Sequence, residues 1–313
     1  MFYNLLQRNN SETNIYDRYN YWEKHRECIN SIITKRVNEY NKDCGSIIIL
    51  GAGNCDDVDL NFLSESFSKV FLSDYCEDNI YAGIKKQNAH LKNNITVLPG
   101  EDYTALGNCN FYNDLENSLN QGKSVKDIIR LIRNTANSIH NESVLNKYNE
   151  RFDIVVTMPV YTQICMNLSE EIISLYSNSY SNSDLRKIKD EFNYLDIYAT
   201  RSYNDLMFRL CKKEGMMILF TDIVELCPLE HKKMKMVNDC IVKGRIMDLT
   251  PLINSEGISG AVHGIKDFTD RVRNAKESVI LAAWVWHFDK FKSYLFYSIS
   301  YDLKELNYGN KKD

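Results

Sequence analysis

Short, almost entirely apolar runs alternate with helical patterns along most of this chain. The runs are SIIIL (46–50), KVFLS (69–73), ITVLP (95–99), FDIVVTM (152–158) and GMMILFTDI (215–223). A strand that is apolar on both sides is covered on both faces, and strands that alternate with helices form parallel sheets. The pattern therefore predicts a doubly wound α/β fold with a mostly parallel sheet.

The end of the chain departs from this alternation. ESVILAAWVWHF (277–288) and KSYLFYSISYDL (292–303) are two long β-prone runs separated by three residues. A connection this short cannot contain a crossover helix, so the two runs must pair as an antiparallel hairpin. We therefore expect a seven-stranded, mostly parallel sheet with an antiparallel C-terminal hairpin strand.

Three segments exceed what such a sheet requires. Residues 1–44 predict an N-terminal helical extension, and residues 45–313 the sheet domain, with insertions at about 104–150 and 224–276. Insertions at the ends of a rigid sheet are where recognition tends to lie. The extension, which is rich in Tyr and Trp, is expected to be either a lid over a bound ligand or a dimer contact, so a homodimer is left open.

Composition and charge argue against several classes of function. The formal net charge is −4, and the nine cysteines include no C-x-x-C pair. A generally basic nucleic-acid surface and a metal site are therefore not expected. Because no apolar run approaches the roughly 18 residues that cross a membrane and no signal-peptide pattern is present, we expect a cytoplasmic protein without a membrane partner.

A glycine turn follows the first predicted strand, in the stretch SIIILGAGNCDDVDL (46–60). Gly51 and Gly53 would let the backbone approach a ligand closely. The dinucleotide fingerprint requires a third glycine three residues later, where Asp56 stands instead. Its carboxylate would repel a pyrophosphate, so an NAD or nucleotide-sugar enzyme is the less favoured alternative.

The same stretch resembles motif I of the class I (Rossmann-like) S-adenosylmethionine-dependent methyltransferases. Gly51 and Gly53 match the first two glycines of that motif, and Cys55 stands at the third. Ile49 stands where the family has an acidic residue, so one of the three aspartates that follow the turn would have to replace it. The family's cofactor has no phosphate and carries a sulfonium cation, with which nearby carboxylates are compatible.

The resemblance implies S-adenosylmethionine as cofactor and gives roles to residues after the other strands. Asp74 ends the second run, where the family's carboxylate binds both ribose hydroxyls, and Glu101 or Asp102 would meet the adenine amino group. The cofactor-binding residues implied in this way are Gly51, Ala52, Gly53, Asn54, Asp57, Asp74, Tyr75, Glu101, Asp102, Tyr103, Met158 and Pro159.

Each acidic residue in this set also has a structural interpretation. Asp74 is equally compatible with a helix cap, and Glu101 and Asp102 with a solvated turn. The aspartates after the glycine turn would lie in the first turn of a helix, where the helix dipole favours carboxylates without any ligand. The order of these residues along the chain, rather than any one of them, supports the resemblance.

The acceptor side is less well defined. Met158-Pro159-Val160-Tyr161 is similar to the [DN]-P-P-[YF] motif of nucleobase and glutamine N-methyltransferases, but methionine cannot accept hydrogen bonds from an amine, which argues against nucleobase methylation. Tyr161, Gln163 and His287 are the candidate catalytic residues, with packing or surface positions as the alternative for each. Strand alternation places Trp284 and Trp286 on the face opposite His287.

These features predict a methyltransferase that acts on an oxygen or nitrogen of a small molecule or a peptide-like metabolite. The alternative is a non-catalytic, methyltransferase-like subunit that binds a protein partner. The hydrophobic residue at Ile49 is the feature that favours this alternative.

Overall fold

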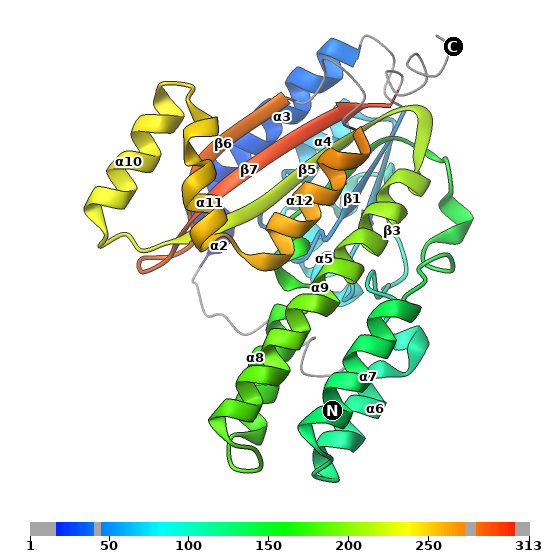
Figure 1. Cartoon of the computed structure of the whole chain (residues 1–313). Coiled ribbons are helices and arrows are strands. Elements are labelled where there is room, and N and C mark those ends of the chain that lie inside the picture. Colours follow the sequence, from blue (N-terminus) through cyan, green and yellow to red (C-terminus); the bar gives the residue numbers. More distant parts are fainter. Residues whose placement is uncertain (1–16, 41–44, 273–279, 304–313) are drawn as a thin grey trace, which may run out of the picture.

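The computed structural model describes residues 17–40, 45–272 and 280–303 (Figure 1). Residues 1–16 and 41–44 of the predicted extension, and 277–279 of the first hairpin run, lie outside the described residues. The strands are β1 (Ser46–Leu50), β2 (Lys69–Ser73), β3 (Ile95–Val97), β4 (Phe152–Thr157), β5 (Cys211–Leu226), β6 (Ile280–His287) and β7 (Ser293–Asp302).

The described strands form one seven-stranded sheet in the order β3-β2-β1-β4-β5-β7-β6. Strands β1 to β5 pair in parallel, and β7 is antiparallel to both of its neighbours, β5 and β6. The predicted mostly parallel sheet with an antiparallel strand in a C-terminal hairpin is therefore confirmed.

Helices cover both faces of this sheet. They are α2 (Arg18–Tyr21), α3 (Glu23–Tyr40), α4 (Leu60–Ser66), α5 (Glu77–Lys86), α6 (Phe111–Asn120), α7 (Val125–Ser138), α8 (Met166–Tyr176), α9 (Asn182–Leu210), α10 (His231–Val242), α11 (Thr250–Glu256) and α12 (Ser259–Val272). Among the described helices, none combines the length and the apolar character needed to cross a membrane.

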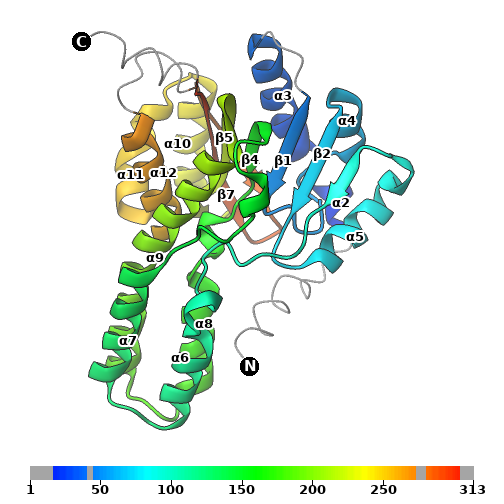
Figure 2. The ribbon, with the colours of Figure 1, turned by 90° about the vertical axis from the view of Figure 1, so that its right-hand side faces the viewer.

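The side chains of β1 alternate between two hydrophobic cores. Ile47 and Ile49 pack with apolar residues of α3, α4 and α5 on one face, whereas Ile48 and Leu50 pack with those of α6 to α12 on the other. Figure 2 shows these two helical layers on either side of the sheet. Because every β1 residue is buried, an unbroken apolar run was the correct signal for this strand.

Strand β5 is longer than its apolar run predicted. It extends from Cys211 to Leu226, and its first residues include the polar sequence KKE at 212–214. A register shift between Asp222 and Val224 allows pairing with β7 to continue to Leu226. Hydrophobicity alone marks the central part of the strand and misses both ends.

A helical projection extends beyond one end of the sheet (Figures 1 and 2). Helices α6 and α7 belong to the predicted insertion at 104–150, but α8 and the first half of α9 project beside them and were not among the predicted insertions. Arg133 on α7 makes two hydrogen bonds to the Glu191 carboxylate on α9, at 2.6 and 3.1 Å. The projection is therefore joined laterally by an ion pair as well as by apolar contacts.

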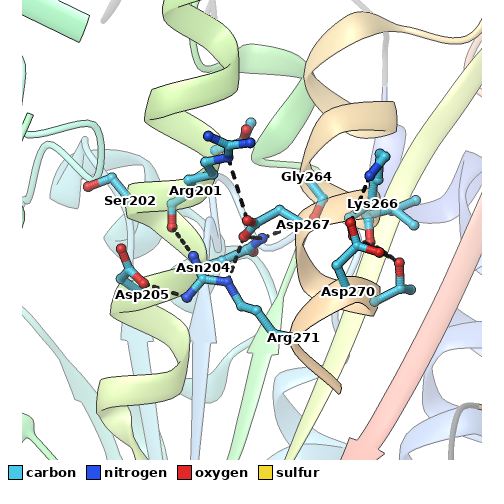
Figure 3. Close-up of polar contacts among 12 residues, drawn as sticks. Arg201, Ser202, Asn204, Asp205, Gly264, Lys266, Asp267, Asp270 and Arg271 are labelled. Carbon is cyan, nitrogen blue, oxygen red and sulfur yellow. Dashed lines mark hydrogen bonds and ion pairs between the residues drawn. The ribbon is translucent and has the colours of Figure 1, made fainter. Parts of the chain in front are cut away.

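A polar network joins α9 to α12 (Figure 3). The Asn204 side-chain amide donates to the Gly264 carbonyl (3.0 Å) and to the Asp267 carboxylate (2.9 Å), which also accepts from Arg271 (2.7 Å). On its other side, Asn204 Oδ1 accepts the Tyr161 hydroxyl at 2.5 Å. The network fixes Tyr161 between the two helices.

We expect Gly264→Ala to destabilise the chain by about 1–3 kcal/mol, as for overpacked cores. A Cβ at this position would lie 2.5–2.8 Å from three ring atoms of Tyr161, which is fully buried. Denaturant unfolding measures the change. In a Tyr161→Leu background the ring is gone, so the same substitution should cost much less; an equal cost in both backgrounds would contradict the explanation.

Candidate functional site

A cavity of about 480 Å³ opens where β1, β2 and β4 end. In open α/β sheets, ligands bind beyond the carboxyl ends of the strands. Every residue predicted to bind the cofactor lines this cavity except Met158, which is buried in the core beneath it. The folded chain thus brings together residues that the sequence separates by more than 100 positions.

The backbone amides of the glycine turn (Gly51–Gly53) donate hydrogen bonds to other groups of the protein. Gly51 N and Ala52 N both donate to the Ser73 carbonyl at 3.0 Å, and Gly53 N donates to Asp74 Oδ2 at 2.8 Å. In a phosphate-binding loop the backbone amides point at the phosphate. Here all three amides are instead bonded within the protein. This geometry disfavours a dinucleotide for a second reason, independent of the carboxylate at Asp56.

Cys55 has the backbone conformation that explains why a glycine is usual at its position. Its φ is +54°, in the left-handed region that glycine adopts without strain. Its side chain is fully buried, and burial raises the pKa of the thiol far above its usual range. Cys55 is therefore a neutral packing residue. It lies against Gly83 of α5, where an added Cβ would be 2.3 Å from the Asn54 carbonyl oxygen.

The three aspartates after the turn have three different environments. Asp56 is buried and pairs with Lys86. Asp59 is the N-cap of α4 and accepts two of its free amides at 3.0 Å. Asp57 lines the cavity, and its Oδ1 has no hydrogen-bond partner among the described residues. Asp57 is therefore the one of these three aspartates with a buried carboxylate oxygen that lacks a hydrogen bond among the described residues.

Asp74 connects the ends of β1 and β2. Besides the bond from Gly53, its Oδ1 accepts from Cys76 N at 3.1 Å. A carboxylate has about four lone-pair sites, so two backbone bonds leave acceptor capacity toward the cavity. Burial raises the pKa of Asp74, although these backbone donors act in the opposite direction. Both the capping and the ligand-binding interpretations of Asp74 fit this geometry.

The turn after β3 has two carboxylates with different surroundings. Asp102 Oδ1 accepts from Thr104 N (3.0 Å) and Oδ2 from Gly107 N (2.9 Å), so its carboxylate organises its own loop. Glu101 lines the cavity, and partial burial raises its pKa. Tyr103 is buried and donates to the Ser73 hydroxyl at 2.7 Å. Glu101 is thus the side chain in this turn best placed to meet a ligand.

The three candidate catalytic residues lie in three different places. Tyr161 begins the 3₁₀ turn η4 (Tyr161–Gln163), is buried between α9 and α12, and does not line the cavity. Gln163 is exposed and lines the cavity. His287 is exposed at the end of β6, where its Nδ1 is 3.0 Å from the Ser293 hydroxyl, and it does not line the cavity.

Several cavity residues were not among the candidate site residues. They are Arg18, Trp22, Thr162, Glu170, Asp222, Trp286, Phe288, Lys292 and Tyr294. One had a readable signal: Asp222 is the only charged residue in the apolar run at 215–223, and a carboxylate within a buried strand usually has a specific role. Thr162 and Glu170 follow β4, and the remaining residues come from the N-terminal helices and the C-terminal hairpin, whose meeting the sequence does not encode locally.

A buried histidine faces Asp57. The Trp284 indole donates to His25 Nδ1 at 3.0 Å, so the proton of the neutral ring is on Nε2, which lies 3.6 Å from Asp57 Oδ1. Burial, together with Arg26, lowers the pKa of His25 to about 3. His25 therefore stays neutral at physiological pH and does not neutralise the Asp57 carboxylate.

Two carboxyl groups that line the cavity have pKa values raised to near neutral pH. Burial raises the pKa of Asp57 to about 7, with repulsion from Asp56 and Asp222 adding to it and Arg18 and Arg26 opposing it. Burial likewise raises the pKa of Asp222 to about 7, although Thr162 donates to its Oδ1 at 2.8 Å. The cavity thus contains two carboxylates whose charged forms are disfavoured by burial.

We expect Asp57→Asn to stabilise the folded chain above pH 7. The pKa of Asp57 is about 3.9 in the unfolded chain and about 7 in the folded chain. Between these two pH values the folded state binds more protons than the unfolded state, so the free energy of unfolding falls as the pH rises toward 7. It does not recover above pH 7. Thermal unfolding should show a melting temperature a few degrees higher for the variant at pH 8 and little changed at pH 4. A higher melting temperature of equal size at both pH values would contradict this.

Known proteins resemble the chain only remotely. No protein-family model matches it, and no curated protein does. Similar solved structures include the N-methyltransferase NodS from Bradyrhizobium japonicum WM9 with S-adenosyl-L-homocysteine (8% identity, TM-score 0.39, covering 96% of this chain and 97% of that one). Two others are magnesium protoporphyrin IX methyltransferase from Synechocystis PCC 6803 (10%, 0.40, 95% and 92%) and a methyltransferase from Aquifex aeolicus (10%, 0.35, 85% and 88%).

The chain's own topology is more informative than these remote likenesses. Its strand order is β3-β2-β1-β4-β5-β7-β6, β7 is antiparallel, and the cavity lies beyond the ends of β1 and β2. Dehydrogenases on a related sheet lack this reversed strand. The chain has the fold of the class I (Rossmann-like) methyltransferases.

Proposed function

We propose that the chain is an S-adenosylmethionine-dependent methyltransferase that acts on an oxygen or nitrogen of a small molecule or a peptide-like metabolite. The observation that carries the proposal is the Asp74 carboxylate. It anchors the glycine turn through Gly53 and keeps acceptor capacity toward the cavity. A vicinal diol, as in a ribose, needs two acceptors at such a point.

The residues of the cavity fit this cofactor better than a phosphate ligand. The amides of the glycine turn are bonded within the protein, and the carboxylates of Asp57, Asp74 and Glu101 line the same space. A cofactor with a sulfonium and an amino group benefits from these charges, whereas a pyrophosphate would be repelled. When bound, the cofactor supplies an activated methyl group.

Individual residues take separate parts in this binding. Asp74 would hold the ribose hydroxyls, Glu101 the adenine amino group, and the glycine turn would contact the cofactor through its backbone. Ile49 is buried in the core and offers no carboxylate to the methionine amino group. Gln163 reaches the same cavity from the η4 turn and would orient the acceptor.

The two alternatives from the sequence receive less support. An NAD enzyme needs amide donors directed at a pyrophosphate, and those of Gly51 and Gly53 are bonded elsewhere. A non-catalytic binding subunit predicts a blocked cleft, whereas the cavity beside the glycine turn has a volume of about 480 Å³.

Calorimetry with S-adenosylhomocysteine tests the cofactor part of the proposal. We expect the intact chain to bind it, and Asp74→Asn to weaken binding at least tenfold, which corresponds to about 1.4 kcal/mol. Asn retains one carbonyl oxygen, so the contact to Gly53 has a substitute while one acceptor is lost. Circular dichroism confirms that the variant is folded.

Asp78→Asn is the matched control for this experiment. Asp78 is exposed in the first turn of α5, four residues from Asp74, and does not line the cavity. Its substitution should leave binding unchanged. The cofactor assignment is overturned if the intact chain does not bind S-adenosylhomocysteine, or if NADH binds in its place.

A further inference from the structure

Four aromatic side chains that line the cavity contact one another and form an aromatic wall. This aromatic wall consists of Trp22, which ends α2, Trp286 on β6, Phe288 and Tyr294 on β7. Neighbouring ring centroids are 4.8–5.7 Å apart. The Trp22 indole donates to the Phe288 carbonyl at 2.9 Å, so the wall is held by a hydrogen bond as well as by ring packing.

The aromatic wall already attracts the chain's own cations. The Arg18 guanidinium carbon lies 5.5 Å from the Trp22 ring centroid and 5.7 Å from that of Phe288, and Lys292 Nζ lies 5.9 Å from that of Tyr294. Cations within about 6 Å of a ring face are attracted by its negative quadrupole. The wall therefore provides cation-binding surfaces and not only apolar area.

Carboxylates line the cavity beside this wall. Asp222 is 7% exposed, and one of its oxygens accepts from Thr162; Glu170 lines the same cavity. Asp57 Oδ1 lacks a hydrogen-bond partner among the described residues, and Asp57 and Asp222 repel each other. Three carboxylates thus lie beside the wall, and of the two cations there Lys292 is also paired with Glu225, at 3.3 Å.

His25 lies between the aromatic wall and Asp57. The indole of Trp284 fixes the tautomer, so His25 Nε2–H faces Asp57 and neither group is otherwise bonded there among the described residues. His25 is 4% exposed and is stacked on Trp286 at 4.4 Å between ring centroids. His25 therefore contacts Trp286 of the aromatic wall on its ring face and approaches the Asp57 carboxylate with Nε2.

We propose that this part of the cavity binds the methyl acceptor through a cationic amine, which sits against the aromatic wall and donates to Asp57 and Asp222. The proposal rests on the proposed function, because it identifies the substrate class of the same site. An ammonium group supplies both a positive charge for the wall and N–H donors for the two carboxylates. A carboxylate or phosphate would be repelled here, and an alcohol would leave the negative charge uncompensated.

Tryptophan fluorescence tests the proposal directly. The chain has three tryptophans: Trp22 and Trp286 belong to the aromatic wall, and Trp284 contacts it through His25, which is stacked on Trp286. The probes are hexylamine, 1-hexanol and hexanoate, which share a six-carbon tail and differ in the charge of the head group. We expect hexylamine to change the emission with a Kd at least tenfold lower than that of 1-hexanol, and hexanoate to have no effect.

Two variants and one control locate the effect. Asp57→Asn and Asp222→Asn should each weaken hexylamine binding at least fivefold and leave 1-hexanol unchanged, since both keep the side-chain volume. Glu65→Gln makes the same charge change on α4, at a residue that is 72% exposed, and should have no effect. Equal binding of hexylamine and 1-hexanol, or hexanoate binding as tightly as hexylamine, would overturn the proposal.

These measurements test the amine proposal and the cofactor proposal separately. Hexylamine titrations are run without and with saturating S-adenosylhomocysteine, whose own binding is measured by calorimetry. Cofactor binding without selectivity for the amine overturns the amine proposal alone. Selective amine binding without cofactor binding overturns the methyltransferase proposal and shows a cation site of another function.

Discussion

The ends of β1 and β2 are locked together by three amide hydrogen bonds, and the rest of the site depends on this contact. The Ser73 carbonyl accepts two of them and the Asp74 carboxylate the third, all from the glycine turn. The turn is thereby held against the sheet edge, and its donors are satisfied by protein. One half of the cavity consequently presents carboxylate acceptors rather than amide donors, which selects the charge of any ligand before a single substrate contact is made.

The opposite half of the cavity is built from the two ends of the chain. Trp22 follows α2 and donates to the Phe288 carbonyl after β6, across 266 positions of sequence. Arg26 reaches the Asp56 carbonyl next to the glycine turn, so the same helical segment contacts both halves. Both halves of the cavity are therefore positioned by one set of buried contacts rather than by independent loops.

The sequence predicted the features that local patterns encode. β1 and β2 have the expected bounds because both are apolar on two sides, and most residues predicted to bind a cofactor line one cavity because a glycine turn and strand-end carboxylates are local signals. The contribution of Asp222 to this cavity was not predicted, since Trp22 and Asp222 meet only in the folded chain. Tyr161 was placed with the chemistry by its motif, yet the η4 turn directs it to Asn204 between the helices and leaves Gln163 at the cavity.

The attachment of α2 and α3 bears on how this chain can change over time. Ile29 and Ile33 of α3 fill the core beneath β1, while Trp22 completes the aromatic wall against the hairpin. The described part of the predicted N-terminal extension, residues 17–40, is thus packed into the core of the sheet domain. Because Trp22 packs on Trp286 and donates to Phe288, a substitution in α2–α3 changes the packing of the β6–β7 hairpin as well. We therefore expect these two segments to coevolve.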